Sequence, residues 1–191
     1  MSLFLEMLLA ALICAFAENT IFMTAIGTST LFVASKYPKQ VFAFSLSITY
    51  INVVSSVLLY FSQSFIPYGE LGYIYKPLVF VLIIGLVYIL TLLFLWRFFD
   101  KLFAKLKKFI HLSAFNCIVL GTMFINQQNK ESLLDYVLYA FSVGLGFLIA
   151  SCIVCMNVDK LRNDKVPSSF RGFPVTLIYI GIVSMLIFVL I

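Results

Sequence analysis

Four cysteines and a few polar residues are the side chains of this apolar sequence that could do chemistry. Cys117 directly follows Asn116 and precedes a glycine at Gly121, while Cys152 and Cys155 have the spacing of a metal or redox pair. Thiolates ligate metals and iron–sulfur clusters, but small thiols also fill apolar helices. No second pair accompanies Cys152 and Cys155, so Cys117 is the stronger candidate ligand.

Other residues also carry polar or ionisable groups in apolar surroundings, where such groups are costly and need a reason. Glu18 and Asn19 could line a polar path, or could join two helices by hydrogen bonds. His111, the only histidine, lies among lysines and is expected to contact lipid headgroups, with a proton relay as the alternative. We expect Asn52 and Asn116 to form packing hydrogen bonds rather than to bind a ligand.

The composition places these residues in a membrane protein. The 191 residues are 63% hydrophobic and 11% charged, whereas a soluble domain carries about 25% charged residues. The start of the chain lacks the basic segment and cleavage site of a secretory signal. The net charge of +5 comes from bases beside apolar runs, which predicts topology signals and no nucleic-acid binding. We expect one polytopic membrane domain over residues 1–191, in contact with the lipid bilayer.

Six apolar runs are long enough, or nearly so, to cross a bilayer, which takes about 20 residues. They predict an all-α integral membrane protein with six transmembrane helices, at about 4–26, 41–63, 74–98, 109–126, 134–156 and 173–191. Turn-forming and charged residues between the runs predict five loops. The third of these loops is the charged run at 97–108.

The distribution of basic residues predicts the orientation of the chain. Eleven of the 13 Lys and Arg residues lie in the first, third and fifth loops, and the other two are Lys76 and Lys130. Basic loops are retained in the cytoplasm. Both the N- and the C-terminus are therefore expected on the non-cytoplasmic side.

Three spans in each half are consistent with a duplication whose second copy is inverted in the membrane. Residues 25–28 (Ala-Ile-Gly-Thr) resemble residues 119–122 (Val-Leu-Gly-Thr), and each segment follows an asparagine, Asn19 or Asn116. The predicted repeats are residues 1–98 and 99–191. Small and polar residues interrupt spans one and four, which predicts broken helices. The alternative is that these residues allow unbroken helices to pack closely.

The order of these motifs resembles the RnfA/NqrE family, membrane subunits of Rnf complexes and of sodium-pumping NADH:quinone oxidoreductases. The likeness runs nearly from end to end, and its most specific match is the Asn-Cys signature of the second repeat. It is carried by Glu18-Asn19, by residues 26–36, by the segment from Asn116-Cys117 to Gly121, by residues 139–147, and by the loop segment 166–172.

The resemblance implies a 3+3 inverted-repeat subunit of a bacterial inner membrane that pairs with a homologous subunit of opposite topology (RnfE/NqrD-like). In the family, the two subunits share an intramembrane two-iron two-sulfur cluster, to which each repeat gives one cysteine. The implied function is to help carry electrons across the membrane in a translocase that couples this to Na+ or H+ movement. The implied site residues are Gly27, Ser29, Asn116, Cys117 as the metal ligand, and Gly121. Such a subunit would not turn over a substrate alone.

The sequence departs from the family pattern at the first-repeat ligand, where Ser29 replaces the cysteine and leaves Cys117 as the one thiolate that carries over. Cys14 lies about four helical turns before Ser29, too far to substitute simply. Two other functions therefore stay open. One is a small inverted-repeat transporter or channel lined by Glu18 and Asn19, and the other is a structural assembly subunit that has lost the cluster.

Overall fold

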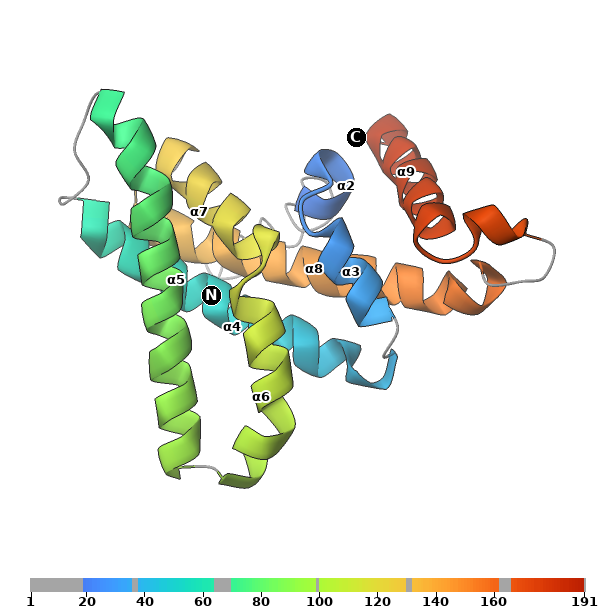
Figure 1. Ribbon diagram of the computed structural model, residues 1–191. Coiled ribbons are helices and arrows are strands. Elements are labelled where there is room, and N and C mark those ends of the chain that lie inside the picture. Colours follow the sequence, from blue (N-terminus) through green and yellow to red (C-terminus); the bar gives the residue numbers. More distant parts are fainter. Residues whose placement is uncertain are drawn as a thin grey trace, which may run out of the picture. The chain divides into compact units, whose positions relative to one another are not determined.

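The computed structural model describes residues 19–35, 38–63, 70–98, 100–129, 132–161 and 166–190. Cys14 and Glu18 lie outside these residues. All regular structure within the described residues is helical, as the sequence predicts (Figure 1). In chain order the helices are α2 (Thr20–Thr24), α3 (Thr28–Ser35), the 3-10 turn η1 (Pro38–Gln40), α4 (Val41–Ser62), α5 (Glu70–Phe98), α6 (Asp100–Ala114), α7 (Cys117–Asn129), α8 (Leu133–Leu161), the 3-10 turn η3 (Ser168–Phe170) and α9 (Phe173–Leu190).

Four segments of the described chain are long and apolar enough to cross a membrane, and they coincide with the expected spans two to five. The sixth expected span is a shorter apolar helix, and the described part of the first expected span contains α2 and α3. An all-α membrane architecture is thereby confirmed. The four segments are Val41–Ser62, Ile74–Arg97, Phe109–Gln128 and Leu133–Asn157.

The expectation that the charged run at 97–108 forms a loop is wrong. Helix α5 continues to Phe98, and α6 begins at Asp100 and runs through the rest of the charged segment. The residues between the lysines are leucine, phenylalanine and alanine. Of these, leucine and alanine favour helices. Ile110 of α6 is buried in the core. The basic segment is therefore an amphipathic helix, which carries the same topology signal as a loop.

The chain divides into two compact units. The terminal unit comprises Met1–Ser45 and Ser142–Ile191, and the central unit comprises Leu46–Phe141. The division cuts α4 after Ser45 and α8 after Phe141, so each unit combines segments from both predicted repeats. The repeat boundary near residue 98 stays a prediction.

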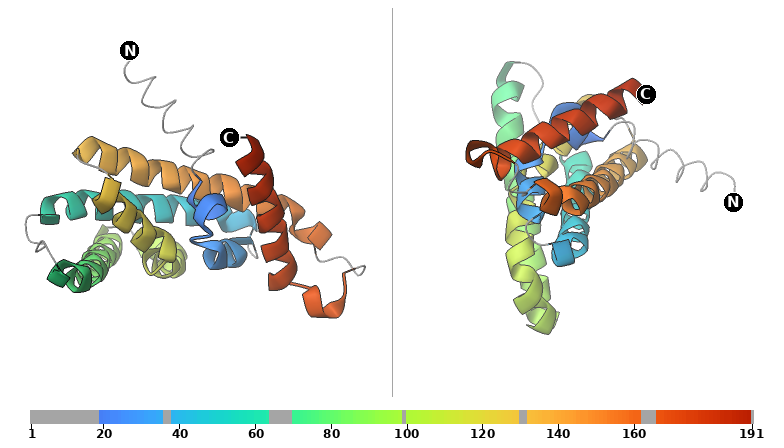
Figure 2. Two further views of the ribbon diagram at one scale, coloured as in Figure 1. Left: turned by 90° about the horizontal axis from the view of Figure 1, so that it is seen from above. Right: turned by 90° about the vertical axis from the view of Figure 1, so that its right-hand side faces the viewer.

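In the terminal unit, α2 packs against α9, and the two lie side by side in Figure 2. The Ser184 hydroxyl of α9 donates a hydrogen bond to the main-chain oxygen of Phe22 in α2. At the other end of α9, Phe173 meets Phe32 of α3 edge to face, with ring centroids 5.1 Å apart. Both pieces of the first span are therefore attached to the last helix.

The core of the central unit forms where α4, α5, α6, α7 and α8 meet. Helices α5 and α6 form a hairpin whose arms lie side by side (Figure 2). Fully or almost fully buried apolar side chains come from all five helices and include Ile51, Phe80, Ile110, Met123 and Tyr136. This core holds the fourth span, which carries Cys117.

Two buried asparagines join the helices of this core. Asn52 of α4 donates to Thr122 Oγ1 of α7 at 3.2 Å and to the carbonyl of Ala140 in α8 at 3.0 Å. Asn126 of α7 donates to Ser56 Oγ of α4 at 3.0 Å. Both bonds between α4 and α7 join residues 70 positions apart, so these helices run in the same direction, as alternating spans two and four must. The packing role expected for Asn52 is confirmed.

Large apolar side chains cover the outer surfaces of α5 and α9. Leu82 of α5 is 63% exposed and Val189 of α9 is 82% exposed, and similar side chains surround both of them. Soluble monomers rarely expose apolar patches of this extent. These surfaces suit lipid tails or the apolar helices of another membrane subunit.

Candidate functional site

The first span is broken within the described residues, as predicted. Helix α2 has only five residues and ends at Thr24, and the next residue, Ala25, has a left-handed φ of 57°. Gly27 follows with a φ of 93°, a conformation that glycine adopts without steric cost. Helix α3 then begins at Thr28. The chain therefore makes a tight non-helical turn between two helical pieces.

Asn19 holds the first piece of this span in place. Its side-chain oxygen accepts a hydrogen bond from the Ile21 amide at 3.1 Å and caps α2. Its side-chain nitrogen donates to the carbonyl of Gly146 in α8 at 2.9 Å. Asn19 is 3% exposed, so both bonds are made inside the terminal unit. Of the two roles considered for Asn19, the structure shows the helix-joining one.

The fourth span is also broken, as predicted. Helix α6 ends at Ala114, Phe115 and Asn116 are not helical, and α7 begins at Cys117. The Asn116 side-chain oxygen accepts a hydrogen bond from the Ile118 amide at 3.2 Å. Asn19 and Asn116 thus form the same local motif, in which an amide oxygen accepts from the backbone N–H two residues later. This shared motif agrees with the likeness between the two segments.

Cys117 is exposed and is the first residue of α7. Its side chain is exposed, while its neighbours Asn116 and Ile118 are buried. The first turn of an α-helix has unpaired N–H groups and the positive end of the helix dipole, which favour an anionic group. A thiolate bound to a metal is such a group. The start of α7 therefore suits an anionic sulfur.

The remaining predicted site residues fall into two groups. Gly121 lies one helical turn after Cys117 in α7, within the central unit. Gly27 and Ser29 lie together in the terminal unit, at the break and at the second residue of α3, and Ser29 is exposed. Gly27 stands at a break whereas Gly121 stands inside a continuous helix, so the two similar segments fold differently after their asparagines.

The described residues contain no group of three or more His, Cys, Asp or Glu side chains that could hold a metal ion. Cys152 is exposed and Cys155 is half-buried, both in the C-terminal third of α8. Nothing in the described part of α8 adds a third ligand to these two. A metal centre at any described cysteine would therefore need ligands from outside the described residues.

His111 has a protein partner that sequence reasoning missed. Its Nδ1 is hydrogen-bonded to the Tyr88 hydroxyl of α5, and the two ring centroids are 5.2 Å apart. Tyr88 also meets Phe115 edge to face at 5.4 Å, beside the break in the fourth span. Tyr88 is one of ten tyrosines in the chain, and no spacing distinguished it. The contact joins α5 to the end of α6 just before Cys117.

A family model described as "Rnf-Nqr subunit, membrane protein" matches residues 7–191 of the chain. The chain belongs to this family. The resemblance inferred from the Asn-Cys signature is thereby confirmed, and membership agrees with the several apolar helices of the structure. The protein is a multi-pass membrane protein of the Rnf-Nqr family.

Curated relatives cover most of the chain at low identity. A protein of Actinobacillus pleuropneumoniae serotype 5b, named as a subunit of an ion-translocating oxidoreductase complex, is 25% identical, over 90% of this chain and 89% of the relative. A Yersinia pseudotuberculosis serotype O:1b protein of the same name is 28% identical, over 88% and 87%. A protein of Acetobacterium woodii, named as a subunit of the Na(+)-translocating ferredoxin:NAD(+) oxidoreductase complex, is 24% identical, over 88% of each chain.

Proposed function

We propose that this protein is a membrane subunit of an Rnf-type ion-translocating electron-transport complex. In this role it helps to carry electrons across the membrane through an iron–sulfur site, and the complex couples this transfer to Na+ or H+ movement. The names of its relatives, each a subunit of an oxidoreductase complex, support membership of such a complex. Cys117 is the residue to which we assign the electron-transfer site.

The observation that carries this assignment is the position of Cys117 at the break in the fourth span. Asn116 interrupts the helix and caps the one that follows, and this leaves the sulfur exposed on the first residue of α7. Irregular backbone at membrane depth is tolerated where protein shelters it or where it lines a cavity. A break that presents a thiol is therefore better explained by a ligand role than by packing.

The proposed cofactor is a two-iron two-sulfur cluster, and this chain would supply part of its ligand set. Such a cluster takes four cysteine ligands and exchanges electrons at a potential set by its surroundings. Cys117 offers one exposed thiolate, and Ser29, also exposed, offers a hydroxyl in place of the second. The other ligands would come from a homologous membrane subunit of opposite topology. Asn116 would fix the position of Cys117, while Gly27 and Gly121 would keep the nearby backbone free of side chains.

The test of this function is electron transfer by the complex purified through a tag on this subunit. Reduced ferredoxin and NAD+, the pair in the name of the Acetobacterium relative, serve as donor and acceptor. Cys117→Ala should abolish electron transfer between them while leaving the other subunits bound. Cys152→Ala is the matched control, because Cys152 is another exposed cysteine, within α8 and away from any break, and it should be nearly silent.

Two outcomes would overturn the proposal in different ways. If both variants have equal and small effects, Cys117 is no ligand and the structural assembly role is favoured. If the tagged chain purifies without partners, the membrane-complex role fails and a stand-alone transporter is favoured.

A further inference from the structure

A groove runs between α4 and α5 of the central unit and encloses about 500 Å³. Helix α4 contributes Tyr50 and Val54 to its lining, and α5 contributes Leu90, Phe94 and Arg97. All of these residues lie in the central unit. Its lining includes neither Asn116 nor Cys117, and the proposed electron-transfer site does not use it.

The walls of the groove are apolar over most of their length. Val87, at one end of the α5 segment that lines it, is 2% exposed, while Leu90 and Phe94 are more than half exposed. The one hydroxyl among the α5 residues that line the groove, Thr91 Oγ1, donates to the Val87 carbonyl at 2.7 Å and is satisfied within its own helix. An apolar chain in the groove would therefore meet no unpaired donor from Thr91.

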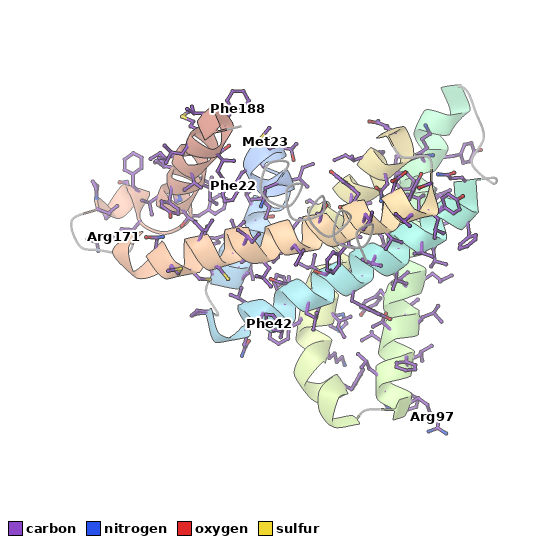
Figure 3. All side chains as sticks on the ribbon, turned by 180° about the vertical axis from the view of Figure 1, so that it is seen from behind. Phe22, Met23, Phe42, Arg97, Arg171 and Phe188 are labelled. Carbon is purple, nitrogen blue, oxygen red and sulfur yellow. The ribbon has the colours of Figure 1, made fainter. Side chains whose placement is uncertain are left out.

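The positively charged side chain of Arg97 lies at one end of the α5 wall of the groove. Arg97 lies in the last turn of α5, and its exposed side chain extends past the end of the helix in Figure 3. From Val87 to Arg97 the helix rises about 15 Å, which is about half the hydrocarbon thickness of a bilayer. A ligand that fills the groove thus has an apolar part of one-leaflet length and meets a guanidinium at one end.

The chain that follows Arg97 is also basic. Residues 97–108 contain five Lys and Arg residues against a single acid, Asp100. Lys107 within this run is exposed. Basic residues next to membrane-spanning helices attract anionic lipid headgroups, and arginine pairs with phosphate through two parallel hydrogen bonds. The charge at this end of the groove is complementary to a phosphate.

We infer that this groove binds an anionic phospholipid, with an acyl chain between α4 and α5 and the phosphate at Arg97. A phospholipid carries both required parts, an apolar chain and an anion, at this separation. A zwitterionic lipid offers the same chain without the net charge that the basic run selects. The lipid composition of the membrane would then influence how α5 packs in the complex.

The experiment uses the purified complex in phosphatidylcholine liposomes that contain a trace of photoreactive phosphatidylglycerol, with a diazirine in its acyl chain. After illumination, labelled peptides are mapped by mass spectrometry. We expect labelling on residues 54–58 of α4 and 87–94 of α5. Arg97→Gln should lower this labelling by about five-fold, as expected for one base near an anionic lipid.

Matched variants separate the headgroup contact from the groove itself. Arg171→Gln removes an exposed arginine from the η3 turn, where its Nε donates to the Val166 carbonyl, and should leave labelling unchanged. Leu90→Trp fills the groove without changing charge and should also lower labelling. Leu82→Trp, on the exposed surface of α5 outside the groove, should not.

The inference is overturned if a phosphatidylcholine probe with the same diazirine labels these peptides equally, or if Arg97→Gln has no effect. Cross-links from the groove to another subunit, with no lipid adduct, would also overturn it, because a protein helix would then be the occupant. These outcomes do not depend on iron content or on electron transfer, so they are independent of the role proposed for Cys117.

Discussion

Cys117 and Ser29 share two properties that matter for residues that ligate a cluster shared between two chains. Both side chains are exposed, and each lies in the first turn of a helix that follows a break, α7 for Cys117 and α3 for Ser29. A serine hydroxyl is a poorer iron ligand than a thiolate, because soft sulfur ligands suit iron–sulfur clusters. On the proposed function, this chain offers one strong and one weak ligand.

Ser29→Cys should therefore raise the iron and acid-labile sulfide retained by the purified complex, since it completes the thiolate set of this chain. Ser29→Ala should lower both quantities. Ser169→Cys, which adds a cysteine at an exposed serine of η3, controls for nonspecific iron binding. Unchanged iron in both Ser29 variants would contradict the assignment of Ser29 as a ligand position.

At this scale, the sequence identified Cys117 and the likeness of Asn19 to Asn116, because residue type and order are visible in it. The hydrogen bonds of the two asparagines were not predictable, since capping depends on backbone angles that the pattern does not state. The contact of Tyr88 with His111 was not predictable either, because it joins residues 23 positions apart in the sequence.

Among the helices, the bonds of Asn52 and Asn126 decide how α4, α7 and α8 pack. Both side chains are fully buried, and each donates to a second helix. In an apolar bundle such bonds specify which helix faces meet, because an unpaired amide there is costly. The parallel register of α4 and α7 depends on this polar contact rather than on apolar packing alone.

A double-mutant cycle on Asn52→Leu and Thr122→Val tests this register. Each change should lower the free energy of unfolding by about 1 kcal/mol, and the coupling energy should be about 0.6 kcal/mol. Reversible unfolding in mixed detergent micelles measures both quantities. The control pairs Asn52→Leu with Ser62→Ala, since the Ser62 hydroxyl bonds within its own helix to the Leu59 carbonyl, and additive effects are expected there. Additivity in the Thr122 cycle too would contradict the contact.

Apolar periodicity and length located α4, α5, α8 and α9 to within several residues, because long apolar runs are strong signals. Helix α6 was missed because its charge density resembles that of a loop. Its apolar residues recur at helical spacing, and this signal could have identified it. Helix α5 begins at Glu70 rather than at residue 74, where the expected span starts, because Glu70 and Gly72 add no apolar signal.

For the whole molecule, the exposed apolar surfaces of α5 and α9 and the basic run after Arg97 bear on how the chain sits in a bilayer. The structure shows that spans two and four run in the same direction, which agrees with alternating spans. The side of the membrane on which the chain ends depends on the positive-inside rule and stays a prediction.

Reporter fusions test the orientation. Alkaline phosphatase fused after Ile191 should be active and green fluorescent protein at the same position dark, because the C-terminus is predicted on the non-cytoplasmic side. Fusions to a chain truncated within 162–165, in the fifth predicted loop, should give the opposite pair of results. Fluorescent protein that is bright after Ile191 would reverse the predicted topology.

The most direct test of the central claim is the iron content and electron paramagnetic resonance spectrum of the complex purified through this subunit. We expect the signal of an intramembrane two-iron two-sulfur cluster in the native complex and in Cys152→Ala, and its loss in Cys117→Ala with all subunits still bound. A complex that retains the same signal and the same iron in Cys117→Ala would contradict the claim that Cys117 carries the electron-transfer site.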